Sequence, residues 1–356
     1  MKIIKYTEKV STKYKIENLT KDKNYGYFDI ETTGLSRHRD SIYLIGLSVP
    51  LSTDTYEITL LFNDDGISES QLLIEFLKYI KTYNLDILIE FNGDSFDIPF
   101  VKERCKINKI PDFISNIATI DIYRCVKCLK KPLKFSSLKQ KSIEQFLGIN
   151  REDSASGGEL IQVYLSYLAT KSPDLLESLL LHNHDDVLGL IKVCDIFSYI
   201  DIFKGNFIVN DFKRDEDIFI FKCHLNNPLN HKLQLSAKDA SIQAYNEDMS
   251  VYIKTLNGEL KYFFENYKDY FYLPDEDEAI HKSIAQFVDK NHRVKATKNN
   301  CYTKKSGYFL PVFSDCDLNT FKTECNSKIK YIDGDTLSDL PNINEYVSDV
   351  ICNILS

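Results

Sequence analysis

The run Tyr25-Gly26-Tyr27-Phe28-Asp29-Ile30-Glu31-Thr32-Thr33-Gly34 places two carboxylates among β-branched and aromatic residues and ends in a glycine. Alternate side chains of a strand point to one face, so we expect Asp29 and Glu31 to project together while Phe28 and Ile30 are buried. Two acids held side by side repel each other unless a cation lies between them, and hard oxygen ligands suit Mg²⁺ or Mn²⁺ better than Zn²⁺. The run alone is also typical of a solvated strand end, so its meaning depends on carboxylates further along the chain.

The sequence around this run predicts an α/β domain over residues 25–200. Further strands are predicted at Ile42–Val49, Glu57–Phe62 and Leu85–Phe91, and the first three strands form a meander. Helices are predicted from Ser68 to Tyr83, from near Phe96, and from Ser172 to about Ile200, the last beginning with a serine cap and a proline. A meander combined with crossover helices indicates a mixed sheet flanked by helices.

The regions on either side of residues 25–200 differ from this stretch in composition and in hydrophobic pattern. Residues 1–24 are polar and rich in lysine, and they are expected to be a short N-terminal lead-in. Residues 201–356 are expected to form a smaller α+β C-terminal region, in which short alternating runs over about 205–264 predict an antiparallel β module. The stretch 265–356 mixes helix and strand, with a charged helical segment expected at 275–300 and a final helix from about Ile343.

Composition narrows the class of protein. With 356 residues, 43% of them hydrophobic and 27% charged, the chain is typical of globular proteins of about two domains. Its net charge of −8 excludes a protein that coats nucleic acid or an anionic membrane by bulk charge. No run approaches the roughly 20 apolar residues of a membrane span, and no signal peptide is recognised. The nine cysteines have no regular spacing, and Cys125-x-x-Cys128 has no partner motif for zinc, so a reduced, cytoplasmic protein is expected.

Two further motifs carry acids. Asn92-Gly93-Asp94-Ser95-Phe96-Asp97 lies where a strand gives way to a helix, a place where α/β sheets bind ligands, and Asp97 is expected beside Asp29. His182-Asn183-His184-Asp185-Asp186 interrupts the hydrophobic final helix, and its first and last residues share a face at i and i+4. The alternatives are that the acids of the first motif only cap the helix and that the second motif is a solvent-exposed face.

Taken together and in this order, the three motifs resemble those of the DEDD (DnaQ-like) exonuclease superfamily. The similarity extends to its YprB-type ribonuclease H-like branch through Asp121-Ile122-Tyr123-Arg124, Ser137-Leu138-Lys139, Phe146-Leu147-Gly148-Ile149 and Gly157-Gly158-Glu159. It covers about residues 25–200. The resemblance implies a ribonuclease H-like fold with a mixed five-stranded sheet between helices.

The resemblance also implies a metal-dependent hydrolase. The family's four metal-binding acids match Asp29, Glu31, Asp97 and Asp186, which would hold two ions, Mg²⁺ or Mn²⁺, about 4 Å apart. The implied reaction is phosphodiester hydrolysis, and the leading hypothesis is a 3′→5′ exonuclease acting on single-stranded DNA or RNA. Residues of the same motifs are expected to contact the substrate, namely Thr32, Thr33, Asn92 and Phe96.

One position departs from the family pattern. The superfamily's fifth residue, which orients the attacking water, is a Tyr four residues before the last Asp or a His five residues before it. Here His182 stands at the Tyr position and Leu181 at the His position. A neutral imidazole is a competent general base near pH 7, so His182 is predicted to be catalytic, with His184 as the weaker alternative. The departure leaves exonucleolytic and structure-specific endonucleolytic cleavage both open.

Two basic clusters are candidates for binding phosphates. Residues 124–141 carry seven cations and no acid, and of these Lys130, Lys131, Lys134 and Lys139 are predicted to bind the substrate. Cations at 290–305 alternate with Tyr302, Tyr308 and Phe309, a pattern that suits a single strand held by charge and stacking. Alternatively, the cations at 124–141 form a solubilising surface, and the aromatic residues of the second cluster belong to the hydrophobic core. A catalytically silent nucleic-acid-binding protein is the rival function, while the nucleic acid, DNA or RNA, and any protein partner stay open.

Overall fold

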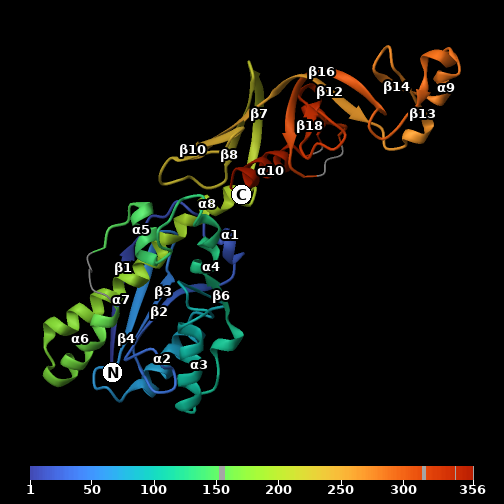
Figure 1. Cartoon of the computed structure of the whole chain (residues 1–356). Coiled ribbons are helices and arrows are strands. Elements are labelled where there is room, and N and C mark those ends of the chain that lie inside the picture. Colours follow the sequence, from blue (N-terminus) through green and yellow to red (C-terminus); the bar gives the residue numbers. More distant parts are fainter. Residues whose placement is uncertain (152–156, 315–317, 341, 356) are drawn as a thin grey trace. The chain divides into compact units, whose positions relative to one another are not determined.

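The computed structural model describes residues 1–151, 157–314, 318–340 and 342–355. The chain forms two compact units (Figure 1). The first comprises Met1–Ile200 with Asn227–His231, and the second comprises Asp201–Asn226 with Lys232–Ser356. Within the described residues, no helix combines the length and the apolar composition that crossing a membrane requires.

The first unit is built on a mixed sheet, which confirms the predicted α/β class. The strand order is β1-β4-β3-β2-β5-β6, in which β1 to β4 are antiparallel neighbours and β5 and β6 run parallel to β2. The strands are β1 (Lys2–Lys9), β2 (Tyr25–Thr32), β3 (Ile42–Pro50), β4 (Thr55–Phe62), β5 (Ile87–Glu90) and β6 (Ala118–Asp121).

The sheet has six strands where five were expected, because the residues predicted as a polar lead-in include a strand. Lys2 to Lys9 pair antiparallel with β4, from Lys2 opposite Phe62 to Lys9 opposite Thr55. Lys2, Lys5 and Lys9 are exposed. Lysines on an outermost strand discourage pairing with another chain, so the polar composition that suggested a lead-in is that of an edge strand.

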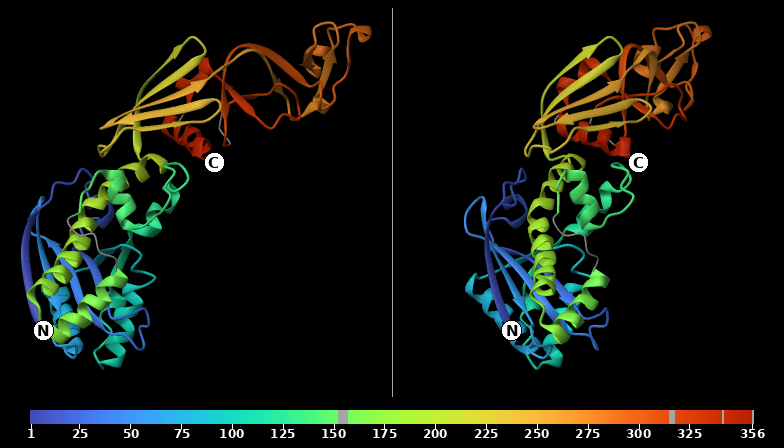
Figure 2. Two further views of the ribbon diagram at one scale, coloured as in Figure 1. Left: turned by 60° about the vertical axis from the view of Figure 1, so that its left-hand side comes forward. Right: turned by 90° about the vertical axis from the view of Figure 1, so that its left-hand side faces the viewer.

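Helices cover both faces of this sheet (Figures 1 and 2). On one face α2 (Glu69–Thr82) and α3 (Asp97–Ile107) enclose a core with Phe28 and Ile30 of β2. On the other face α7 (Pro173–Val193) contacts β2, β3 and β4. The remaining helices of this unit are α1 (Glu17–Thr20), α4 (Ile122–Val126), α5 (Gln140–Leu147) and α6 (Gly157–Thr170), and α8 (Phe197–Phe203) begins at its end.

The second unit consists mainly of antiparallel sheets. The predicted β module is a five-stranded sheet in the order β7-β8-β11-β10-β9. The strand β12 (Leu256–Phe263), also within the predicted module, pairs instead with β16 (Tyr302–Val312). The five strands of the first sheet are β7 (Phe207–Asp215), β8 (Ile218–Leu225), β9 (Leu233–Ser236), β10 (Ala240–Tyr245) and β11 (Asp248–Lys254).

The end of the chain confirms one expectation and corrects another. The final helix is present as α10 (Ile343–Leu355). The helix expected at 275–300 is wrong, since only α9 (Lys282–Ala285) is α-helical there. Asp277 has a φ of 55°, a left-handed turn that reverses the chain and is incompatible with a continuing helix. The other strands here are β13 (Tyr270–Leu273), β14 (Glu278–His281), β15 (Val294–Lys295), β17 (Thr320–Phe321) and β18 (Lys330–Asp333).

Candidate active site

The alternation of β2 separates its acids from its core residues. Phe28 and Ile30 pack on the α2 and α3 side, whereas Asp29 and Glu31 face α7. The helix approaches closely because β3 has a glycine opposite Asp29. A Cβ added at Gly46 would lie 2.3 Å from Asn183 Oδ1 and 2.5 Å from Val187 Cγ2. His182 and Asn183 of α7 therefore reach the acids of β2.

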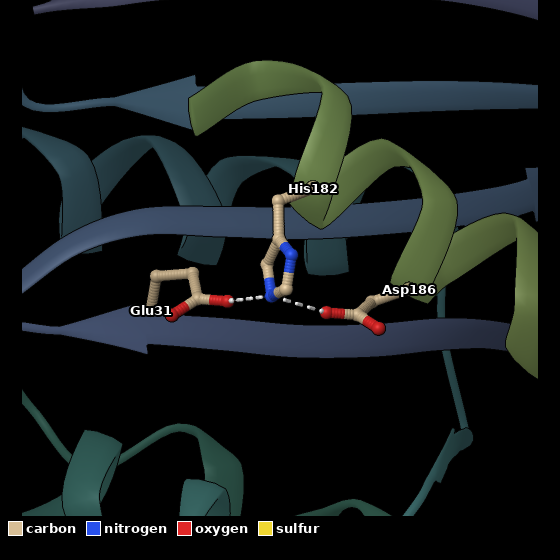
Figure 3. A group of neighbouring side chains, drawn as sticks. All are labelled: Glu31, His182 and Asp186. Carbon is tan, nitrogen blue, oxygen red and sulfur yellow. Dashed lines mark ion pairs between the residues drawn. The ribbon is translucent and has the colours of Figure 1, made fainter. Parts of the chain in front are cut away.

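Glu31, His182 and Asp186 form the closest group in this site (Figure 3). His182 Nε2 lies 3.3 Å from Glu31 Oε1 and 3.1 Å from Asp186 Oδ2. One ligand atom from each of the three residues lies within 4.8 Å of the others. The i, i+4 spacing thus places the imidazole and the carboxylate of α7 on one face, pointing at β2, as expected from the sequence.

Asp29 and Asp97 lie beside this group and are held by hydrogen bonds. Asp29 Oδ2 accepts a hydrogen bond from Asn183 Nδ2 at 2.7 Å, and Asp97 Oδ1 accepts one from the Ile30 amide at 3.2 Å. Asp97 is the first residue of α3, so the sheet, α3 and α7 each contribute to one acidic region.

Burial and mutual repulsion perturb these acids strongly. Burial, followed by the charges of Asp186, Asp97 and Glu31, raises the pKa of Asp29 well above its usual range. Burial raises the pKa of Asp97 to about 7. Burial also raises the pKa of Glu31, although His182 opposes this rise. Acids that hinder one another's ionisation in this way are stabilised by added positive charge.

Arg151 supplies one such charge, and the sequence analysis missed it. Its Nη1 donates to Asp186 Oδ1 at 2.5 Å, and its Nη2 donates to Glu144 Oε1 at 2.7 Å. Glu144 is buried and lies against Gly189 of α7, where a Cβ would be 2.3 Å from Glu144 Oε1. No spacing rule links Arg151 to the acidic motifs, because only the packing of α5 on α7 brings them together.

A cleft of about 560 Å³ contains several of the residues predicted to bind substrate. Asn92, Lys130 and Lys139 line it, whereas Lys131 and Lys134 are exposed and are not among its lining residues. Its other lining residues are Phe91, Tyr123, Ser136, Ser137, Leu138 and Gln140. Gln140 Nε2 also donates to the backbone oxygen of Asp186 at 3.0 Å, which connects the cleft to the acidic site.

The other predicted contact residues have structural partners. Thr32 Oγ1 donates to the Gly34 oxygen at 2.7 Å, and Thr33 Oγ1 accepts from the Ser41 amide at 2.9 Å. Phe96 packs against the core beneath α2 and α3. These three residues shape the turn and the helix start, so substrate contact by them stays a prediction without structural support.

Two of the three aromatic residues in the second basic cluster are not exposed for stacking, whereas Tyr308 is partly exposed. Phe309 and Tyr302 are buried. Lys304 Nζ lies 3.1 Å from Asp277 Oδ2, and Lys305 pairs with Asp333. The two rings belong to the interior of the second unit, and both of these lysines have acidic partners.

Residues 26–198 match the RNase H superfamily family model. This part of the chain is an RNase H superfamily domain. The match covers the sheet from the second residue of β2 through β6 and includes every residue of the acidic site described above.

Two proteins and one solved structure illustrate the similarity. The uncharacterized protein YprB of Bacillus subtilis is 28% identical over 185 residues, which are 48% of this chain and 41% of YprB. The DNA polymerase of Ostreid herpesvirus 1 is 51% identical over 43 residues, 12% of this chain and 2% of the polymerase. The family B DNA polymerase of Pyrobaculum calidifontis aligns with a TM-score of 0.39 and 14% identity, covering 70% of this chain and 35% of that structure. The chain thus spans less than half the length of these relatives.

The donor set of the RNase H domain suits a divalent metal. RNase H-like nucleases use such ions, and Glu31, His182 and Asp186 offer two carboxylates and an imidazole within one coordination sphere. The neighbouring Asp29 and Asp97 carry raised pKa values that a cation would lower. The residues present therefore fit a metal-binding site.

Proposed function

We propose that this protein is a metal-dependent nuclease of the DEDD type that hydrolyses phosphodiester bonds. Asp29, Glu31, Asp97 and Asp186 are the proposed metal-binding acids. The observation that carries the proposal is the convergence of Glu31 and Asp186 on His182 inside an RNase H superfamily domain. Bound Mg²⁺ or Mn²⁺, two ions in the proposal, would activate a water and stabilise the leaving oxygen.

The protein's own side chains have distinct parts in this proposal. Asn183 orients Asp29 through its 2.7 Å hydrogen bond, and Arg151 orients Asp186. His182 is the proposed general base: with Glu31 and Asp186 engaged by metal, a neutral imidazole whose Nε2 carries no proton could take the proton of the attacking water. Asn183 and His182 are buried, and Asp29, Asp186 and Arg151 are partly buried, so solvent screens the charges of these groups only in part.

We propose that the substrate is the 3′ end of a single-stranded DNA or RNA lying in the cleft next to Asp186. Lys130 and Lys139 on the cleft wall would bind phosphates, and Phe91 and Tyr123 offer ring surfaces for bases. Similarity to a DNA polymerase supports a polynucleotide substrate. The buried acids argue against a silent binding protein, because unoccupied they only destabilise the fold.

A labelling experiment tests the mode of cleavage. Single strands of DNA and of RNA, each labelled at the 5′ end or the 3′ end, are incubated with Mn²⁺ beside a circular strand of the same sequence. A 3′→5′ exonuclease converts the 5′-labelled strand into a ladder, releases the 3′ label at once as a mononucleotide and leaves the circle intact. Cleavage of the circle would support the endonuclease alternative instead.

A further inference from the structure

A second group of acids lies at the neighbouring strand ends of the RNase H domain. Glu90 and Asp121 are the last residues of the parallel strands β5 and β6, and they are direct partners in the strand register. Asp94 lies in the turn that follows β5. One carboxylate oxygen from each of the three residues lies within 4.8 Å of the others. Glu90 and Asp121 are buried, and Asp94 is partly buried.

The turn after β5 is shaped to hold these acids in place. Asn92 has a φ of 67°, and its amide donates to Asp121 Oδ1 at 2.9 Å. The Gly93 amide donates to Glu90 Oε2. A Cβ at Gly93 would lie 2.7 Å from that same oxygen, so a glycine is needed for the Glu90 carboxylate to sit under the turn. Asp94 Oδ1 accepts from Thr119 Oγ1 at 2.6 Å. Glu90 and Asp121 are thus each oriented through one oxygen.

Two buried carboxylate oxygens of this group have no hydrogen-bond partner among the described residues. Among the described residues, no hydrogen-bond donor reaches Glu90 Oε1 or Asp121 Oδ2. Glu90 is 0% exposed and Asp121 is 5% exposed, so bulk water does not solvate them. A buried oxygen of this kind is costly unless a proton or a cation occupies its free lone pairs.

The local charge is unbalanced as well. Arg124 pairs with Asp94, Nη1 to Oδ2 at 2.5 Å, and its guanidinium is largely exposed. Although burial opposes it, hydrogen bonding from Thr119 and Arg124 holds the pKa of Asp94 below its usual value. Burial, followed by the charge of Asp121, raises the pKa of Glu90 to about 8. Within the part of the chain that the structure describes, these three carboxylates therefore share one ion-pair partner.

We propose that Glu90, Asp94 and Asp121 bind one hard divalent cation, such as Mg²⁺, Mn²⁺ or Ca²⁺. Carboxylate oxygens that coordinate a common ion at about 2.0–2.6 Å lie at most about 5 Å apart, as these do. A single proton bridges two oxygens and would leave the third acid unused. The ion would tie the turn at 91–94 to β6, and this turn leads directly into Asp97 at the start of α3.

The inference is tested by counting bound Mn²⁺ in the full chain after the first site has been disabled. In the double variant Glu31→Gln/Asp186→Asn, electron paramagnetic resonance of free Mn²⁺ is expected to show one retained ion. Adding Glu90→Gln to this background is expected to weaken that binding about tenfold or more, since losing even an outer-shell partner of a metal ligand costs about tenfold or more in affinity. Adding Glu17→Gln, an exposed acid on α1, is the control and leaves the ion bound.

Asp94→Asn in the same background keeps the inference testable if the Glu90 variant does not fold. Asp94 is partly exposed and an asparagine can still accept from Thr119, so the expected result is again weaker Mn²⁺ binding. A double variant that binds no Mn²⁺ at millimolar concentration overturns the inference and leaves a shared proton as the alternative. Binding that survives both Glu90→Gln and Asp94→Asn overturns it too. The experiment measures Mn²⁺ binding and not nuclease activity. Its result is therefore independent of whether the proposed nuclease function is correct.

Discussion

Asp97 illustrates the conflict between burial and charge that defines the site. Its carboxylate is removed from water at the start of a helix, and its neighbours are acids. The sequence motif predicted Asp29, Glu31, Asp97 and Asp186 because each lies in a short local pattern. Arg151 could not be predicted, since its contact with Asp186 depends on how two helices pack and no local pattern encodes it.

The pKa of Asp97 has a consequence for stability in metal-free protein. Its usual value of 3.8 rises to about 7 on folding, so the folded protein keeps a proton that the unfolded chain releases. The free energy of unfolding in the presence of a chelator should therefore fall as the pH rises from about 4 to about 7 and level off above this range. Urea unfolding across this range measures it.

The variant Asp97→Asn should flatten this pH dependence in part, because Asp29 and Glu31 keep their own raised pKa values. Ser95→Ala, at an exposed neighbour on the same turn, should leave the dependence unchanged. An identical slope in Asp97→Asn and in the unmodified protein would contradict the assignment of this proton to Asp97.

At the scale of elements, the close packing of α7 on β3 positions the site. The long, strongly patterned elements of the first unit were predictable, since their burial follows from local periodicity. The strand β1 was not, because an edge strand exposes its lysines and resembles a polar tail. The expected helix at 275–300 failed because tertiary pairing overrides a weak helical pattern with strands.

Gly46→Ala tests the importance of this packing. The added Cβ would collide with Asn183 and Val187, so α7 must shift away from β2. We expect a loss of about 1–3 kcal/mol in unfolding free energy and at least about a tenfold loss in nuclease kcat, since small displacements of catalytic groups are costly. Denaturant unfolding and the end-labelled assay measure the two effects.

Gly158→Ala is the matched control, since its Cβ would meet nothing within 4 Å and lies in α6. It should keep full activity and be slightly stabilised by the better helix propensity of alanine. Full activity in Gly46→Ala would show that the position of α7 does not control the site.

For the molecule as a whole, the net charge of −8 means that any nucleic acid must be attracted locally. In the proposed function this attraction comes from Lys130 and Lys139, which line the cleft in the first unit, whereas the nearby Lys131 and Lys134 lie outside its lining. The sequence predicted a basic segment but did not distinguish the lysines that line the cleft from those that do not. A run of cations has no periodicity that would show which side chains face a cleft.

The double variant Lys130→Gln/Lys139→Gln should weaken binding of a single strand about tenfold or more and reduce the slope of log affinity against log salt by about 0.7 per lysine. Fluorescence anisotropy with a labelled strand at several salt concentrations measures both. Lys131→Gln/Lys134→Gln removes the same charge from the same region and should have the smaller effect. Equal effects of the two double variants would indicate diffuse attraction in place of a defined track.

The most direct test of the central claim is metal-dependent hydrolysis by the unmodified protein and by Asp29→Asn. Asp29 is tied to Asn183, and asparagine preserves its size, so the variant should fold and have an unchanged far-ultraviolet circular dichroism spectrum. The account predicts that the unmodified protein degrades an end-labelled single strand only with Mg²⁺ or Mn²⁺, and that Asp29→Asn is slower by about a thousandfold or more, as expected when metal-assisted catalysis is lost. Equal degradation by the two proteins, or degradation that persists in a chelator, would contradict it.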